Sequence, residues 1–206
     1  MSPLIRLRAE NLTLRRGERT LFHARSFTVE AGEAVALTGP NGSGKTSLLR
    51  TLAGFIRPTT GRLRFEGAGG EVEADDVRRT QCHLIGHLDG LSASRTARAE
   101  LLFAARWTGA GEAAALIAAA RLGLERMLDL EVRKLSAGQR RRLALARLLA
   151  APRCLWLLDE PLSPLDGAAR ALFGEVMTAH LASGGLIIAA VHDPLPIGAR
   201  TLAIGG

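Results

Sequence analysis

The segment GPNGSGKT, Gly39 to Thr46, constrains the fold of this 206-residue chain more than any other. It matches the pattern G-x-x-x-x-G-K-[ST], in which glycines allow successive backbone N–H groups to turn inward around a phosphate. A short apolar run, AVALT, precedes it. Apolar residues then recur at helical spacing, at Leu48, Leu49, Leu52 and Phe55. The sequence therefore predicts a buried strand, a phosphate-binding loop and a helix that presents its positive end to the same anion.

Individual loop residues have distinct expected roles. Lys45 can reach the β- and γ-phosphates of a nucleotide, and the Thr46 hydroxyl can ligate Mg²⁺. The other residues of the segment are expected to surround the phosphates: Gly39, Pro40, Asn41, Gly42, Ser43, Gly44 and Ser47. The alternative is a chance glycine-rich turn, but the strand before the loop and the helix after it argue against that interpretation.

Two acidic residues end a second apolar run. CLWLLDE, residues 154–160, is typical of a strand buried on both faces. Its last two residues should therefore lie at the sheet edge where ligands bind in open α/β folds. We expect Asp159 to hold the metal and Glu160 to orient and polarise an attacking water. The alternative is that the pair belongs to the N-cap region of a helix.

The rest of the chain alternates between strand and helix patterns. IRLRAENLTL alternates apolar and polar residues, which predicts a half-buried strand at an antiparallel edge. Residues 91–133 contain two alanine-rich helical segments and no strand pattern, which indicates a helical insertion. A helix beginning at Ser136 and the buried strand LIIAAV follow. This order predicts a single α/β domain, residues 1–206, with a parallel core sheet and a helical subdomain at about 91–150.

Composition narrows the class of protein. Two cysteines are too few for a disulfide scaffold, and no apolar run reaches the roughly 18 residues of a membrane span. The N-terminal residues do not resemble a cleavable signal, so a cytosolic, soluble protein is expected. The net charge of +7 allows nucleic acid, an anionic membrane face or a phosphate ligand as partner.

The stretch CHLIGH raises a separate question, because it holds two of the five histidines beside one of the two cysteines. Either it is a small metal or haem ligand set, or His87 serves chemistry encoded elsewhere. A strand would point Cys82 and His83 to opposite faces, and no C-x-x-C-H haem attachment is present. Both observations disfavour the ligand set.

Three further motifs extend the phosphate loop and the acidic strand end into a family pattern. LSAGQ resembles the signature motif of the ATP-binding cassette family, SPLD resembles its D-loop, and the histidine after LIIAAV resembles its switch histidine. The resemblance covers nearly the whole chain. It implies an α/β P-loop NTPase of ABC type, with a mostly parallel core sheet, an antiparallel β edge subdomain and a helical insertion.

The resemblance also implies site residues and partners. ATP would be sandwiched in a head-to-tail homodimer between the phosphate loop of one subunit and the signature motif of the other, with Mg²⁺ at the phosphates. Glu160 and His192 would be catalytic, together with His87 at the place of the Q-loop glutamine. The partner's half of the site would comprise Ser136, Ala137, Gly138, Gln139 and Asp166. The amides at the start of the signature helix offer an anion site that supports this arrangement.

Two positions depart from the family pattern. His87 occupies the place of the Q-loop glutamine, between Gly86 and a flexible Asp-Gly pair, and imidazole can accept or donate a hydrogen bond there. The position that stacks on the base, usually aromatic, is Arg15 or Arg16. A guanidinium plane can stack on adenine, although a solvated basic strand end is an equal alternative.

The local sequence around these motifs most resembles that of the ATPase subunits of haem exporters in cytochrome c maturation. This resemblance implies a peripheral subunit at the cytoplasmic face of the bacterial inner membrane, bound to membrane-spanning subunits and touching neither nucleic acid nor haem itself. The motor of another small transporter, for lipid or another solute, is the main alternative. A soluble cassette acting on DNA or ribosomes is disfavoured, because the chain has one phosphate loop and no heptad run. A non-hydrolysing structural cassette is disfavoured by the intact catalytic positions.

Overall fold

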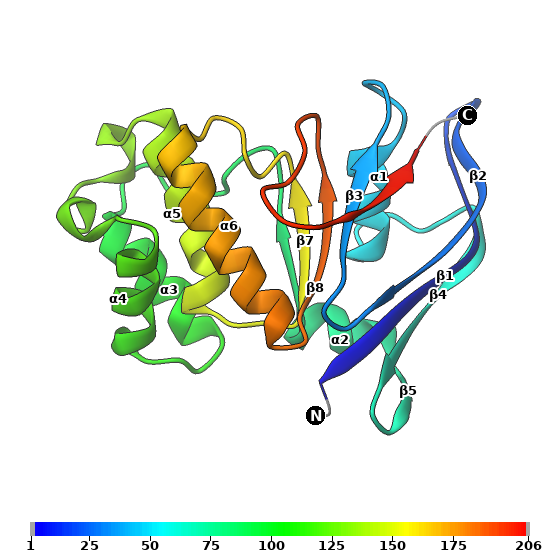
Figure 1. Ribbon diagram of the computed structural model, residues 1–206, viewed down its shortest axis with the longest axis horizontal. Coiled ribbons are helices and arrows are strands. Elements are labelled where there is room, and N and C mark those ends of the chain that lie inside the picture. Colours follow the sequence, from blue (N-terminus) through cyan, green and yellow to red (C-terminus); the bar gives the residue numbers. More distant parts are fainter. Residues whose placement is uncertain (1–2, 205–206) are drawn as a thin grey trace.

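The structure of the protein is a computed structural model that describes residues 3–204. A parallel sheet lies at the centre, with a helical group at one end and a separate antiparallel sheet at the other (Figure 1). The parallel sheet has the order β6-β7-β8-β3-β9. Its strands are β3 (Ala34–Thr38), β6 (Cys82–Ile85), β7 (Leu155–Asp159), β8 (Leu186–Ala190) and β9 (Arg200–Ala203). The predicted strand–loop–helix unit and the parallel core are thus confirmed.

The N-terminal strands form the predicted antiparallel edge. The sheet has the order β2-β1-β4-β5, and every pairing in it is antiparallel. Its strands are β1 (Leu4–Arg16), β2 (Arg19–Glu30), β4 (Thr60–Gly67) and β5 (Gly70–Val72). Along β1, apolar side chains such as Leu7 and Leu12 are fully buried, whereas Arg6 pairs with Glu30 at 2.7 Å on the outer face. The alternation in the sequence therefore corresponds to one buried and one exposed face.

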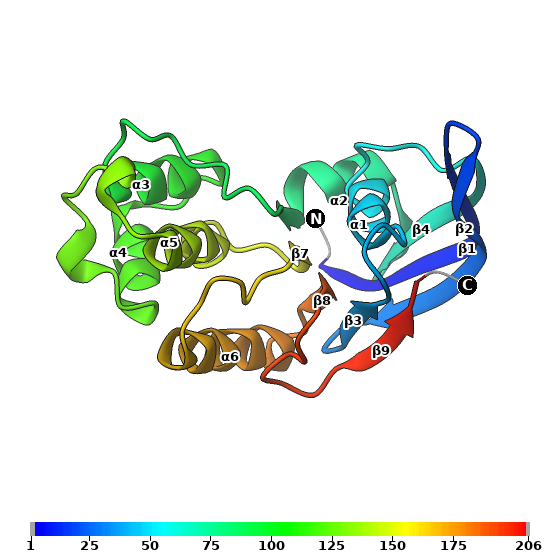
Figure 2. The ribbon, with the colours of Figure 1, turned by 90° about the horizontal axis from the view of Figure 1, so that it is seen from above.

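Helices cover both faces of the parallel sheet (Figure 2). On one side lie α1 (Lys45–Leu52) and α2 (Ala74–Thr80), together with the antiparallel sheet. The other helices are α3 (Ala97–Trp107), α4 (Glu112–Arg121), α5 (Ala137–Ala150) and α6 (Gly167–Ala182), with 3-10 turns η1 (Glu125–Met127) and η2 (Val132–Lys134). Alternate residues of each strand point to the two sides, as Val35 and Leu37 pack toward α1 while Ala34 and Ala36 pack toward the α3–α6 side.

The predicted helical insertion packs as a group without a core of its own. Helices α3, α4 and α5 contact one another, and their buried residues join those of α6 and one sheet face in a single hydrophobic cluster. The boundary of a helical subdomain at about 91–150 stays a prediction. Among residues 3–204, no helix is long and apolar enough to cross a membrane.

One expectation about α1 is wrong. Leu48, Leu49 and Leu52 are fully buried as the spacing predicted, but the helix ends at Leu52 and the Phe55 side chain is 75% exposed. The cause is Gly54, whose φ of 84° turns the chain away from the helix two residues after its end. A position with positive φ favours glycine and stops helical periodicity.

Candidate functional site

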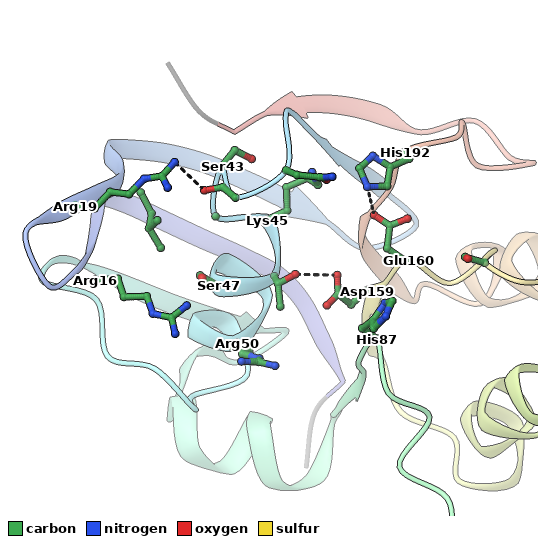
Figure 3. Close-up of a pocket in the computed structure, with 16 residues that line it drawn as sticks. Arg16, Arg19, Ser43, Lys45, Ser47, Arg50, His87, Asp159, Glu160 and His192 are labelled. Atoms are coloured by element: carbon green, nitrogen blue, oxygen red, sulfur yellow. Dashed lines mark hydrogen bonds and ion pairs between the residues drawn. The ribbon is translucent and has the colours of Figure 1, made fainter.

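The predicted site residues converge at one edge of the parallel sheet. The carboxyl ends of β6, β7, β8 and β3 lie side by side, so the residues that follow them are neighbours although they are far apart in sequence. They surround a cavity of about 600 Å³ (Figure 3). The cavity is lined by Arg16, Arg19, Leu21, Asn41, Gly42, Ser43, Gly44, Lys45, Thr46, Ser47, Arg50, His87, Asp159, Glu160, Ser163 and His192.

The phosphate loop has a backbone shape that its glycines permit. Gly39 has a φ of 137°, and a Cβ there would lie 2.1 Å from the backbone oxygen of Ile204, so no other residue fits. Gly44 has a φ of 105°, and a Cβ there would press against the side chains of Leu21 and Phe22. These conformations are open to glycine at little steric cost. They bring the loop close to β2 and β9 and turn it into the cavity.

Three observations show that this loop fits a phosphate and a hard cation. Helix α1 begins at Lys45 without a side-chain cap, so its first amides are open to an anion. The buried hydroxyl of Ser43 has no hydrogen-bond partner among the described residues, which fits a ligand oxygen at that point. The Thr46 hydroxyl lies 3.1 Å from Asp159 Oδ1, and a hydroxyl beside a carboxylate is the oxygen donor set that Mg²⁺ prefers.

Lys45 points into the same loop. Its Nζ donates hydrogen bonds to the carbonyl oxygens of Gly39 at 2.7 Å and Pro40 at 3.3 Å. The side chain is 7% exposed, so the ammonium group is held at the bottom of the cavity by backbone oxygens. A phosphate entering the loop would meet both this ammonium group and the α1 amides.

Glu160 and His192 face each other across the ends of β7 and β8. His192 Nε2 lies 3.3 Å from Glu160 Oε1 (Figure 3). Glu160 has a φ of 50°, which is uncommon for a residue with a side chain and costs on the order of 1–3 kcal/mol. Its backbone N–H donates to the carbonyl of Ala190 at 3.0 Å, which holds this conformation against the neighbouring strand. The sequence prediction that the carboxylate lies at the sheet edge is met by this geometry.

The residues of the CHLIGH stretch lie in two different environments: Cys82 is buried and His83 is half-buried, whereas His87 lines the cavity. Cys82 is buried in the cluster beneath α1, and burial raises the pKa of its thiol to about 12. His83 Nε2 donates to the Ala151 carbonyl at 2.5 Å, and burial lowers the pKa of its imidazole to about 4. His87, by contrast, lines the cavity near Asp159. Among residues 3–204, no group of three or more metal-ligating side chains is assembled.

The signature residues lie elsewhere. Ser136, Gly138, Gln139 and Asp166 line a second cavity of about 330 Å³, and none of them lines the first. Ala137 is the first residue of α5. Ser136 Oγ accepts from Gln139 N at 3.2 Å, and Gln139 Oε1 accepts from Ser136 N at 2.8 Å, which closes a capping box. Asp166 caps α6 by accepting from Ala169 N at 2.8 Å. One chain alone therefore does not bring the signature residues to the phosphate loop.

Comparison with known proteins places this geometry in a family. The ABC transporter family model matches residues 22–163. The chain belongs to the ABC transporter family. It is 46% identical to the cytochrome c biogenesis ATP-binding export protein CcmA of Nitrobacter winogradskyi, over 98% of this chain and 99% of that protein. It is 47% identical to the CcmA of Rhodopseudomonas palustris, over 92% of this chain and 93% of that protein.

A solved structure supports the fold independently. The dimeric structure of a bacterial ABC transporter cassette matches with a TM-score of 0.83 and 22% identity, over 97% of this chain and 94% of that one. At this identity the likeness concerns the fold alone. The predicted fold class and the predicted enzyme class, an ABC-type ATPase, are both confirmed by these matches.

Sequence reasoning about this ABC ATPase missed several residues at the cavity. Arg19 and Arg50 line it, and Arg19 Nη2 lies 3.4 Å from the Gly42 carbonyl oxygen. Of the two candidates for stacking on the base, Arg16 lines the cavity. Arg141, in the run RRR, was also missed, although it is 2% exposed and contacts the backbone behind Asp159 and Glu160. The only sequence signal was an arginine at an otherwise apolar helix face.

Proposed function

We propose that the chain is the ATP-hydrolysing subunit of a membrane complex for haem export in cytochrome c biogenesis. The observation that carries the catalytic part is the meeting of Lys45, Thr46, Asp159 and Glu160 in one cavity. The observation that carries the biological role is the near-complete match to CcmA proteins. We place the subunit at the cytoplasmic face of the bacterial inner membrane, as a peripheral component.

The cavity residues divide the chemistry of ATP hydrolysis between them. The α1 amides and Lys45 bind the β- and γ-phosphates and compensate their charge. Thr46 and Asp159 would hold Mg²⁺, which neutralises charge that develops on the phosphates. Glu160 orients the attacking water and accepts its proton, and His192 keeps the Glu160 carboxylate in place across 3.3 Å. Arg16 stacks on the base, in place of an aromatic side chain.

A second copy of the chain completes the site. Ser136, Ala137, Gly138 and Gln139 carry the start of α5, whose positive end would meet the γ-phosphate held by the partner subunit. The D-loop residue Asp166 lies in the same second cavity as Ser136. In a head-to-tail dimer, each of two ATP molecules would therefore contact one phosphate loop and one signature motif.

A groove beside β6 supports a membrane-spanning subunit, CcmB-like or CcmC-like, as partner. The groove has a volume of about 350 Å³ and lies between β6, α3 and α5. On its rim, Phe103 is 51% exposed and Trp107 is 74% exposed, which is unusual for large aromatic side chains in contact with water. His87 follows β6 by two residues and reaches the ATP cavity. A helix seated in this groove would thus press on the segment that carries His87.

The catalytic part of the proposal is tested by Glu160→Gln. This variant keeps the side-chain shape but cannot accept a proton, so ATP binding should persist while turnover falls by about 10²- to 10⁴-fold. An ATP-bound dimer should then accumulate and be visible by size-exclusion chromatography. Turnover equal to that of the unchanged protein would refute the role of Glu160.

The biological role is tested by isolating the tagged chain with its native membrane partners. Recovery of haem-exporter subunits and loss of c-type cytochromes when the gene is deleted would support the proposal. Recovery of membrane subunits for a lipid or another solute would favour the alternative motor. Titration of haem into the purified chain tests whether the chain binds its cargo directly. A stoichiometric Soret shift that is abolished by His87→Ala or Cys82→Ser would overturn the expectation that the chain does not bind haem.

A further inference from the structure

Arg141 is a buried cation whose contacts differ from those of the other charged residues. It lies in the second turn of α5, and its side chain is 2% exposed. Its one carboxylate partner in the described part of the chain is Asp89, with Nη1 and Oδ1 3.1 Å apart. A buried guanidinium is costly unless all of its donors are used. The contacts that use them are therefore informative.

One side of the guanidinium holds the end of the acidic strand. Nη2 donates to the carbonyl oxygens of Asp159 at 2.6 Å and Glu160 at 2.8 Å, and Nε donates to that of Pro161 at 3.2 Å. Three consecutive carbonyls are thus fixed by one side chain. The middle one belongs to Glu160, the residue with a φ of 50°. A conformation of this kind persists only where its surroundings determine it, and Arg141 supplies part of that determination.

The other side of the guanidinium holds the segment that carries His87. Nη1 donates to the Gly86 carbonyl at 2.9 Å as well as to Asp89 Oδ1. These two residues flank His87. The Asp-Gly pair, expected from sequence to be flexible, is further tied by Arg147, which donates to the carbonyls of Asp89 and Gly90. Two arginines of α5 therefore hold this segment by hydrogen bonds.

We propose that Arg141 is a positioning residue for ATP hydrolysis, which fixes Glu160 and the His87 segment relative to each other and to the signature helix. Helix α5 begins at the signature motif. Closure of a dimer on that motif would therefore be transmitted through Arg141 to the backbone of Glu160 and to the segment that carries His87. The planar guanidinium is suited to this task, because its five donors point in fixed directions on both sides. The inference rests on the proposed function, since it presumes that Glu160 orients the water.

The test compares Arg141→Gln and Arg141→Lys in the full chain assembled with its membrane partners. Arg141 has no hydrogen bond to Gly39–Ser47, so the Kd for ATP should stay unchanged. Turnover per bound nucleotide should fall by about 10²-fold in Arg141→Gln, because a displacement of about 1 Å at the reacting groups has an effect of that size. Arg141→Lys keeps the charge but offers one nitrogen, so it should recover only part of kcat or none.

Arg78→Gln is the matched control. Arg78 also donates to a backbone carbonyl, that of Leu52 at 3.2 Å, and pairs with Asp75 at 3.1 Å, but it does not line the ATP cavity. Its loss should lower the Tm while kcat per bound nucleotide stays unchanged. An equal fall of kcat in Arg78→Gln and Arg141→Gln would overturn the proposal, as would full kcat in Arg141→Lys. If Arg141→Gln does not fold, the lysine variant decides.

Glu160→Gln, measured in the same assembly, separates the two levels of inference. If Glu160→Gln retains full turnover, the proposed catalytic role fails whatever the Arg141 variants do. If Glu160→Gln is inactive while Arg141→Gln turns over normally, only the positioning role of Arg141 is refuted. Loss of turnover in both variants, with ATP binding retained, supports the two assignments together.

Discussion

The N-termini of α1 and α5 line separate cavities, and these two helix ends are built differently. Helix α1 starts after Gly44 with no side-chain cap, and Lys45 lies beside its first amides. Helix α5 starts after Ser136 with both bonds of a capping box in place. The first end leaves its N–H groups available, whereas the second satisfies part of its own with Ser136 and Gln139.

This difference indicates which half of the ATP site is ready in a single chain. The α1 half combines open amides, a cation and the Thr46–Asp159 pair, so we expect it to bind nucleotide by itself. The half of the site at the start of α5 has neither a lysine nor a metal ligand among its predicted residues. A phosphate that binds there must compete with the capping bonds of Ser136 and Gln139 for the helix amides. We therefore expect the phosphate-loop half to set nucleotide affinity, and turnover to require the signature half of the partner subunit as well.

The largest effect on ATPase activity should come from mutating each half of the ATP site in turn and then combining the two variants in one dimer. Lys45→Ala should weaken nucleotide binding and Ser136→Arg should block the partner's phosphate, so each homodimer has two defective sites and should be inactive. In a mixed dimer, one site combines an intact Lys45 with an intact Ser136, while the other carries both changes. ATPase assays of tagged mixtures should recover at most one of the two sites. Normal activity per site in pure Ser136→Arg protein would show that the halves are not shared.

A several-fold effect is expected at His87, which lines the ATP cavity and follows β6, the strand that lines the groove with Phe103 and Trp107. His87→Gln keeps a hydrogen-bond donor and acceptor and should retain substantial ATPase activity. His87→Ala removes both and should lower activity more in the assembled complex than in the isolated subunit. Parallel assays of the two preparations measure this difference. Equal losses in both would place the role of His87 within the ATP cavity alone.

His83 should affect stability in acid and not chemistry. Burial lowers its pKa to about 4, below the unfolded value of 6.5, so between these values the unfolded chain binds more protons. The free energy of unfolding should therefore fall as the pH drops from 6.5 to 4, by at most about 1.4 kcal/mol for each pH unit. His83→Gln should flatten this dependence in urea titrations and leave turnover near neutral pH unchanged. His180, whose pKa is also lowered by burial, supplies a remaining slope.

The smallest effect is expected at the capping box itself. Gln139→Ala removes one of its two bonds, which should lower the free energy of unfolding by about 1 kcal/mol or less. Denaturant titration against a surface alanine substitution such as Glu175→Ala measures this difference. A larger loss would mean that α5 is held by its cap more than by packing. No loss would mean that the box contributes nothing before ATP binds.

Residues whose role depends on local pattern could be predicted from the sequence. The phosphate loop, its flanking strand and helix, and Asp159 and Glu160 at the end of a buried run follow from glycine spacing and apolar periodicity. Ser136 at the start of α5 follows from the polar residue before an apolar helical pattern. These features are encoded within a few residues, because hydrogen bonding and side-chain direction repeat over short distances along a strand or helix.

Only the tertiary structure decided which of these elements meet. The strand order β6-β7-β8-β3 places His87, Glu160, His192 and the phosphate loop along one edge, and no local pattern specifies that order. The tertiary structure also decided that Arg16 and not Arg15 lines the cavity, that Phe55 is exposed, and that the signature motif lines a separate cavity. Arg141 shows the reason most directly. Its proposed role depends on hydrogen bonds to residues that are 18, 19, 20, 52 and 55 positions away in the sequence, and these bonds depend on strand register and helix placement. The sequence determined the parts of an ATP site, and long-range packing determined their distances.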